Sequence, residues 1–391
     1  MNGLDATRRA WVEIDLDALR QNVQHIRSRL AGRCRLLAVI KADAYGHGAV
    51  AAGEAALAAG ADCLGVATLE EGIQLREAGL GCAIVVLSPI HTPAEVKAVA
   101  HWRLEPTLCT PRQVLVCGEH LARPHPIHLK IDTGMGRLGA PWSEAVAFVR
   151  LARSQPQLQI ASLYSHLATA DEPDSAALAE QHRRFEQVLA ALKQEALRPA
   201  CVHLANSAAA LGDPSLHYDL VRVGMALYGL YPAPIFCQTV PLQPVMQVRA
   251  RITQVKDVPA GTGVSYGHTY RTTKDARLAT VAIGYADGVP RRLSNRMEAL
   301  LHGTRVPQVG TITMDQLLID CSQLPQAREG DIVTLIGSDA AETIGADDWA
   351  TRLETIAYEI VCGFKHRLPR IVRAASPSPR PPEGARSEES V

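Results

Sequence analysis

The chain has 391 residues, and its 40 Lys and Arg balance 40 Asp and Glu, so that the formal net charge is zero. This length predicts two or three domains, or one large α/β barrel with an accessory unit. The balanced charge offers no field that would attract nucleic acid or an anionic membrane, so we expect neither as a partner. The 9 cysteines include no CxxC pair. This argues against a disulfide framework and a structural zinc site, and we expect no metal.

The N-terminal residues 1–10 are polar and form a short extension before a strand-like stretch at 11–16. They lack the apolar region of a signal peptide, and no apolar run in the chain approaches the roughly 20 residues of a membrane span. We therefore expect a cytoplasmic protein.

Short apolar runs alternate with longer helical patterns between residues 36 and 224. The runs span residues 36–40, 63–67, 83–88, 104–108, 127–132, 160–165, 201–206 and 220–224. The interval between runs suits one strand, one helix and two short loops, which is typical of a parallel sheet. The pattern predicts an α/β fold, a (β/α)8 barrel of the TIM type, over residues 11–240.

The hydropathy pattern is different over residues 241–373, where apolar runs are shorter, alternate with polar residues and are separated by Gly and Pro. This predicts a mostly antiparallel β domain, with the boundary in the Pro-rich stretch 231–244. The strand at 11–16 fits either domain. The tail at 374–391 has no apolar periodicity, and we expect it to be disordered.

Polar residues follow several of the barrel strands, at the end where barrel enzymes carry their functional groups. Lys41 directly follows the first apolar run, and Tyr45 comes four residues later. Lys41 is either a surface side chain whose stem covers the strand end or a desolvated amine that forms a Schiff base with pyridoxal phosphate. Further polar residues at strand ends are Lys130, Arg137, Ser165, His166, His203, Ser207 and Arg222. The amides of Gly224 and Met225, after the last strand, suit a phosphate.

Seven motifs carry a family resemblance, and they occur in order along the chain. They are IKADAYGHG at 40–48, KIDTGMGRLG at 130–139, HLANSAA at 203–209, RVGMALYG at 222–229, GVSYG at 263–267, GYADG at 284–288 and MDQ at 314–316. Together they closely resemble bacterial alanine racemase, a barrel-type enzyme that uses pyridoxal phosphate. The resemblance covers residues 11–373.

The resemblance implies a two-base racemisation of L-alanine and D-alanine, in a homodimer whose sites are shared between subunits. Lys41 matches the lysine that binds the cofactor and acts on one face of the substrate. Tyr266 matches the base on the opposite face, supplied by the second subunit. Arg222 matches the partner of the pyridine nitrogen, and His166 matches its neighbour in the network that reaches the tyrosine.

The resemblance also implies binding roles. The residues that match cofactor-binding positions are Lys41, Tyr45, His203, Ser207, Arg222, Gly224, Met225 and Tyr358. Arg137 and Met314 match positions that contact the substrate and the cofactor oxygen beside it, and Lys130 matches a lysine that is often carbamylated. Asp171, Tyr285 and Arg291 match positions along an entrance corridor.

Two departures and several alternatives remain at this point. Thr311 and Thr313 stand where many family members have Arg and Cys or Ser, which leaves the charge of the corridor open.

Alternative functions also remain open. A serine or broad-specificity amino-acid racemase on the same fold would carry the same motifs. A pyridoxal-phosphate carrier resembles the barrel alone, and the second domain with Tyr266 argues against it. A decarboxylase is disfavoured, because its Cys-bearing acidic motif is not evident. The use of D-alanine, in the cell wall or as a nutrient, also stays open.

Overall fold

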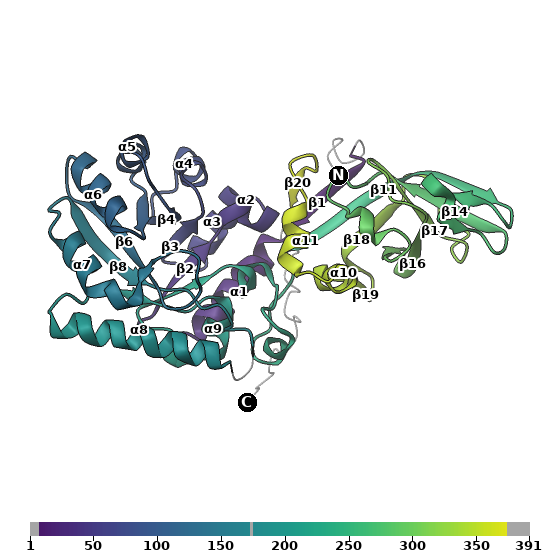
Figure 1. Cartoon of the computed structure of the whole chain (residues 1–391). Coiled ribbons are helices and arrows are strands. Elements are labelled where there is room, and N and C mark those ends of the chain that lie inside the picture. Colours follow the sequence, from purple (N-terminus) through teal and green to yellow (C-terminus); the bar gives the residue numbers. More distant parts are fainter. Residues whose placement is uncertain (1–7, 173–174, 374–391) are drawn as a thin grey trace, which may run out of the picture.

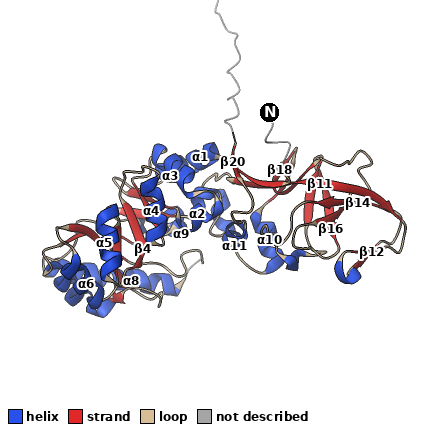
Figure 2. Cartoon of the chain, turned by 90° about the horizontal axis from the view of Figure 1, so that it is seen from above, coloured by secondary structure: helices blue, strands red, loops and turns tan. Residues whose placement is uncertain are grey.

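The computed structural model describes residues 8–172 and 175–373, which form two domains side by side in an elongated molecule (Figures 1 and 2). Residues 1–7 of the extension predicted at 1–10, and the tail predicted at 374–391, lie outside the described residues. The extension is shorter than predicted, because Ala10 already begins the first strand. In Figure 1 the first domain is purple to teal, and the second is mainly green and yellow.

The first domain is a barrel of parallel strands in the order β10-β2-β3-β4-β5-β6-β8-β9. Their bounds are β2 Arg35–Val39, β3 Cys63–Val66, β4 Ile84–Pro89, β5 Glu105–Leu108, β6 His125–Asp132, β8 Leu158–Tyr164, β9 Val202–His203 and β10 Leu220–Val223, with β7 Ala140–Pro141 pairing beside β6. Backbone bonds from Asp219 N to Val202 O at 3.1 Å and from Arg222 N to Ala205 O at 3.0 Å join the last two strands. Each predicted apolar run overlaps one of these strands, so the predicted barrel is confirmed.

Helices cover the outside of this barrel (Figure 1). They are α1 Leu16–Ser28, α3 Ala49–Ala58, α4 Leu69–Glu77, α5 Pro93–Trp102, α6 Pro111–His120, α7 Ala145–Arg153, α8 Ala176–Gln194 and α9 Ser207–Gly212, with short 3-10 turns η2 Trp142–Glu144, η3 Pro214–Leu216, η4 Met225–Tyr228 and η5 Pro234–Gln238. The short segment α2 Lys41–Gly46 follows β2 at the mouth of the barrel. Three consecutive helices, α4 to α6, begin with capping boxes that pair Thr68 with Glu71, Thr92 with Glu95 and Thr110 with Gln113. These reciprocal bonds satisfy amides that the first turn of a helix leaves unpaired. Among the described residues no helix is long and apolar enough to cross a membrane.

The second domain is built on a sheet in the order β19-β18-β15-β16-β17-β14-β11-β1-β20, in which β18 also pairs with β11. The bounds are β1 Ala10–Ile14, β11 Met246–Val258, β14 Ala276–Val281, β15 Glu298–Leu301, β16 Thr304–Val309, β17 Leu317–Asp320, β18 Ile332–Asp339, β19 Glu342–Ile344 and β20 Arg370–Val372, with the separate ribbon β12 Gly263–Val264 and β13 Tyr270–Arg271, the turns η6 Tyr266–His268 and η7 Arg291–Leu293, and helices α10 Ala346–Leu353 and α11 Ala357–Gly363. Most pairs are antiparallel, as predicted. The strand expected at 11–16 is β1, which pairs with β11 and β20 and so joins this second sheet.

Helix α11 of the second domain lies against α2 at the mouth of the barrel. A Cβ atom added at Gly46 would lie 2.6 Å from Val361 O, so only glycine permits this approach. Arg370 Nε donates to Gly46 O at 3.0 Å. The β domain therefore covers the strand end that carries Lys41.

Candidate active site

The turn that carries Lys41 has an unusual backbone. Residues 42–45 all have φ between 53° and 55°, which is the left-handed region, although none of them is glycine. Such a conformation costs about 1–2 kcal/mol for each residue, and strain of this kind collects at functional sites. Asp43 Oδ1 accepts the amide of Ala49 at 2.7 Å and so ties the turn to the start of α3.

The buried side chain of His47 hydrogen-bonds to two carbonyls of the same turn. Its Nδ1 lies 2.8 Å from Ala44 O and 3.0 Å from Tyr45 O. Because carbonyl oxygens only accept, Nδ1 carries the proton. Burial lowers the pKa of His47 to about 4, so the ring is neutral.

Lys41 itself is partly buried at the barrel mouth. Burial, and next the positive charge of Arg137, lower the pKa of its amine below the ordinary value. The negative charge of Glu71 opposes this shift. Compared with an ordinary lysine, the environment therefore shifts the amine toward its neutral form, which is the nucleophilic form.

Arg222 is the centre of a buried hydrogen-bond network. Its Nη1 donates to His203 Nδ1 at 2.8 Å, and its Nη2 lies 3.1 Å from His166 Nδ1. Nη2 also donates to Ser165 O at 2.8 Å and to Leu204 O at 3.0 Å. Burial lowers the pKa of Arg222 to about 10, which still leaves it charged at neutral pH. Burial and the Arg222 charge hold the pKa values of His166 and His203 well below the usual range.

Lys130 lies beside this network. Its Nζ is 5.5 Å from the centre of the Tyr164 ring, and the Arg222 guanidinium is 5.0 Å from the same ring. Burial, then the charges of Arg222 and Arg137, lower the pKa of Lys130 to about 8.

Three polar groups meet where β10 runs into η4. Gly224 N donates to Ser207 Oγ at 3.0 Å. A Cβ atom at Gly224 would lie 2.5 Å from the Tyr45 hydroxyl, so glycine leaves the room in which that hydroxyl lies. Met225 begins η4 and is buried. Hydroxyl and amide donors that converge in this way suit an anion.

Tyr358 reaches the barrel mouth from α11. Burial, followed by the negative charge of Asp171, raises its pKa. Burial, followed by Cys362 and Tyr358, raises the pKa of Tyr45. The predicted residues of the barrel, together with Tyr358, are therefore brought together within one chain.

Four predicted residues lie elsewhere, on the β domain. Tyr266, Met314 and Tyr285 are large hydrophobic side chains with exposed fractions of 73%, 52% and 43%. Their loops are tied together, because Thr311 Oγ1 donates to Tyr266 O at 2.8 Å and Tyr285 N donates to Thr313 O at 3.0 Å. Arg291 starts the nearby turn η7.

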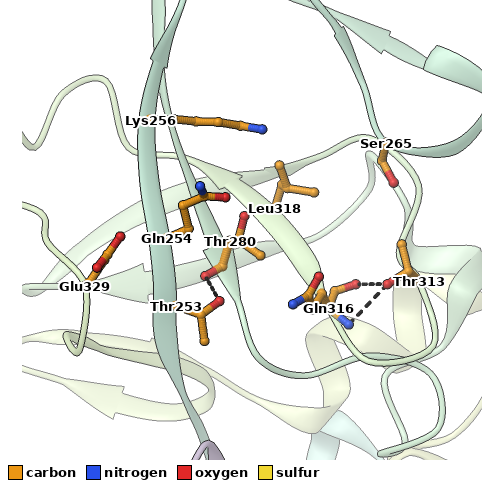
Figure 3. Close-up of a pocket in the computed structure, with 9 residues that line it drawn as sticks. All are labelled: Thr253, Gln254, Lys256, Ser265, Thr280, Thr313, Gln316, Leu318 and Glu329. Carbon is orange, nitrogen blue, oxygen red and sulfur yellow. Dashed lines mark hydrogen bonds between the residues drawn. The ribbon is translucent and has the colours of Figure 1, made fainter.

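These loops border a polar recess on the face of β11, β14 and β17 (Figure 3). Ser265 and Thr313, which line it, directly precede Tyr266 and Met314. Figure 2 shows β12, which leads into Tyr266, at the end of the molecule away from α2. A single chain therefore does not bring Tyr266 to Lys41.

Several residues of the site escaped the sequence analysis. Tyr164 stacks on His203 with ring centres 4.6 Å apart, and its hydroxyl lies 3.0 Å from Thr107 Oγ1. His128 and Ser162 extend the network below Arg222. The alternation of inward positions along β6 and β8 is the signal that could have found them.

Family models match almost the whole described chain. The alanine racemase N-terminal domain matches residues 14–232, and the alanine racemase C-terminal domain matches residues 245–372. With the barrel, its lysine and the β domain, these matches define a two-domain racemase, which is an isomerase.

Individual proteins that are similar to this chain are also alanine racemases. The alanine racemase of Nostoc sp. is 57% identical over 370 residues, which cover 93% of this chain and 96% of that protein. The alanine racemase of Synechocystis sp. is 54% identical, with 93% and 99% covered. The crystal structure of alanine racemase from D-cycloserine producing Streptomyces lavendulae has a TM-score of 0.88 at 39% identity and covers 94% of this chain and 98% of that chain. That of Bacillus anthracis, with bound L-Ala-P, has a TM-score of 0.88 at 38% identity, with 94% and 95% covered. The chain belongs to the alanine racemase family.

Proposed function

We propose that this protein interconverts L-alanine and D-alanine and that it binds pyridoxal phosphate at the mouth of the barrel. The observation that carries the proposal is the cationic cluster of Lys41, Lys130, Arg137 and Arg222. Mutual repulsion in the cluster helps to lower the pKa values of Lys41 and Lys130. An anion bound among these groups relieves that repulsion.

The residues fit pyridoxal phosphate. Tyr45, Ser207 and the amides of Gly224 and Met225 would hold the phosphate, and Tyr358 would close that site from α11. Lys41 would carry the cofactor, as the neutral amine that its surroundings favour. Arg222 donates only, so it would leave the pyridine nitrogen as an acceptor. When bound, the cofactor stabilises negative charge at Cα of the substrate.

The chemistry needs a base on each face of the substrate, because a proton leaves Cα on one side and returns on the other. We assign Lys41 Nζ to one face and the Tyr266 hydroxyl of a second copy of the chain to the other. His166 accepts from Arg222 through Nδ1 at 3.1 Å, so its proton lies on Nε2. Met314 and Arg137 would hold the substrate carboxylate and the adjacent cofactor oxygen.

A homodimer follows from this assignment, since Tyr266 is exposed and the strand that leads into it, β12, lies at the end of the molecule away from α2, which begins at Lys41 (Figure 2). Asp171, Tyr285 and Arg291 would then line the approach to the shared site. The nine cysteines are all free thiols, which suits the reducing cytoplasm. The domain division proposed is a barrel over 11–240 and a β domain over 241–373, with the strand β1 belonging to the sheet of the β domain.

The test begins with the purified protein and pyridoxal phosphate. We expect a visible absorbance band, a pyridoxyl group on Lys41 after borohydride reduction, and loss of the circular dichroism of L-alanine on incubation. A panel of Ala, Ser, Lys and Arg measures breadth, and we expect the highest kcat/KM for alanine. A protein that shifts no spectrum and racemises no amino acid contradicts the proposal.

A further inference from the structure

An unbroken series of buried hydrogen bonds leads away from Arg222 through the barrel. Arg222 Nη1 donates to His203 Nδ1 at 2.8 Å. His203 Nε2 lies 2.8 Å from Ser162 Oγ, and Ser162 Oγ lies 2.6 Å from His128 Nδ1. His128 Nε2 lies 2.8 Å from Glu105 Oε2. We call Glu105, His128, Ser162 and His203 the relay.

The proton positions along the relay follow from its two ends. Arg222 only donates, so His203 accepts at Nδ1, and the neutral ring carries its proton on Nε2. The Nε2–H of His203 donates to Ser162 Oγ, and the Ser162 hydroxyl donates its own hydrogen to His128 Nδ1. His128 in turn donates from Nε2 to the Glu105 carboxylate, which only accepts. Every donor finds one acceptor, and reversing any member leaves two donors or two acceptors face to face.

The relay spans the barrel from one end to the other. Glu105 is the first residue of β5, at the amino end of the strands, and Arg222 lies near the carboxyl end of β10. His128, Ser162 and His203 have exposed fractions of 6%, 2% and 1%. A separate cluster of buried side chains on or beside the barrel strands is apolar and comprises Leu37, Val39, Cys63, Val85, Cys201 and Leu220. Interiors of such barrels are ordinarily filled by branched apolar side chains. The burial of the polar relay residues inside the barrel therefore calls for an explanation.

The buried positive charge of Arg222 supplies that explanation. Within residues 8–172 and 175–373, the hydrogen bonds of Arg222 go to carbonyl oxygens and histidine nitrogens, and none goes to a carboxylate. Glu105, with 19% of its side chain exposed, is the carboxylate to which the relay leads. Outer partners of this kind orient the residues that contact a ligand and fix their tautomers.

We propose that Glu105, His128 and Ser162 are positioning residues that fix the His203 tautomer and the Arg222 guanidinium, and so set cofactor affinity from the opposite end of the barrel. The inference rests on the proposed function only where it assigns pyridoxal phosphate to Arg222. It adds residues that do not contact the cofactor.

A double-mutant cycle on cofactor binding tests the relay as a unit. Glu105→Ala and Ser162→Ala break it at two points that do not touch, and each should weaken pyridoxal phosphate binding by about tenfold. The double variant should bind no more weakly than either single variant, because one break already disables the relay. Glu105→Gln keeps an acceptor for His128 and should recover part of the loss. Glu77→Ala, at the exposed end of α4, is the matched control and should not change binding.

Two results of the binding measurements overturn the proposal: single variants that fold and bind as the parent does, or losses that simply multiply in the double variant. Histidine ring 15N spectra of the full chain before cofactor is added give a second readout. They should report Nε2–H on both His128 and His203, with a change at His203 in Glu105→Ala. A charged or Nδ1–H His203 overturns the relay. A parent protein that binds no pyridoxal phosphate contradicts the proposed function instead, and the spectra still decide the relay.

Discussion

His47 shows how one side chain can hold a strained segment. Its Nδ1 proton is shared between two carbonyls of the left-handed turn, while its Nε2 has no hydrogen-bond partner among the described residues. The ring also stacks on Tyr228, with centres 4.5 Å apart. The role of residue 47 is therefore to donate a hydrogen bond from the place of Nδ1, and a side chain that changes charge is not required.

Replacing His47 separates these roles. His47→Leu removes the ring donor from both carbonyls; Ala44 O keeps the backbone amide of residue 47 at 3.1 Å, whereas Tyr45 O loses the ring N–H. We expect a loss of about 1–3 kcal/mol in the free energy of unfolding. His47→Asn offers an amide N–H in a similar place and should recover part of it. Urea unfolding measures both, and a leucine variant as stable as the parent would refute the role of this bond.

Lys130 gives a prediction about pH. An ordinary lysine is protonated up to about pH 10.4, whereas the pKa of Lys130 is about 8. Above that value the neutral amine predominates, and the neutral amine is the form that combines with carbon dioxide to give a carbamate and a proton. Since Arg137 and Arg222 surround it, the carbamate would gain favourable partners.

With 13C-bicarbonate we therefore expect a protein-bound carbamate signal that is stronger at pH 8.5 than at pH 6.5. Lys130→Ala should abolish the signal, and Lys97→Ala, at an exposed lysine, should leave it. A signal of equal size at both pH values, or one that survives in Lys130→Ala, speaks against a shifted lysine as its source.

At the scale of elements, the junction of β10 and η4 has no spare volume. Gly224→Ala would push a Cβ atom toward the Tyr45 hydroxyl, 2.5 Å away, and disturb the bond to Ser207. We expect weaker pyridoxal phosphate binding by about tenfold, which is about 1.4 kcal/mol, with a small change in thermal stability. Gly81→Ala is the control, because nothing lies within 4 Å of its Cβ position. Equal binding by both variants would contradict the crowding argument.

The strands and the strand-end residues could be predicted from sequence, because apolar runs and the polar residues that follow them are local features. The left-handed turn could not, since Ala42 and Ala44 carry no local preference for positive φ. The relay escaped because His128 and Ser162 sit inside strands that were interpreted as apolar, and only the closed barrel brings them to Glu105. Tyr164 was hidden for the same reason.

Thr311 illustrates a departure from the family pattern that the structure explains in part. Its hydroxyl donates to Tyr266 O at 2.8 Å and lies 3.2 Å from Thr269 Oγ1, and its side chain is buried. The residue thus holds the loop of Tyr266.

On the scale of the whole molecule, the candidate site is divided. Lys41, Arg222 and their neighbours lie at the barrel mouth, while Tyr266, Met314 and Tyr285 project from the β domain and are exposed. Strand β1 fixes the β domain to the start of the barrel, and α11 packs against α2. Because these ties hold the two groups apart within one chain, we propose that a second copy completes the site.

Mixing two defective variants tests this claim most directly. Lys41→Ala and Tyr266→Phe are each expected to lose racemase activity when assayed alone. After subunit exchange, each mixed dimer would contain one site with both Lys41 and Tyr266, so that an equal mixture regains about a quarter of the parent activity. Native mass spectrometry confirms that mixed dimers have formed. If they form and activity does not return, Tyr266 does not complete the site of a second chain.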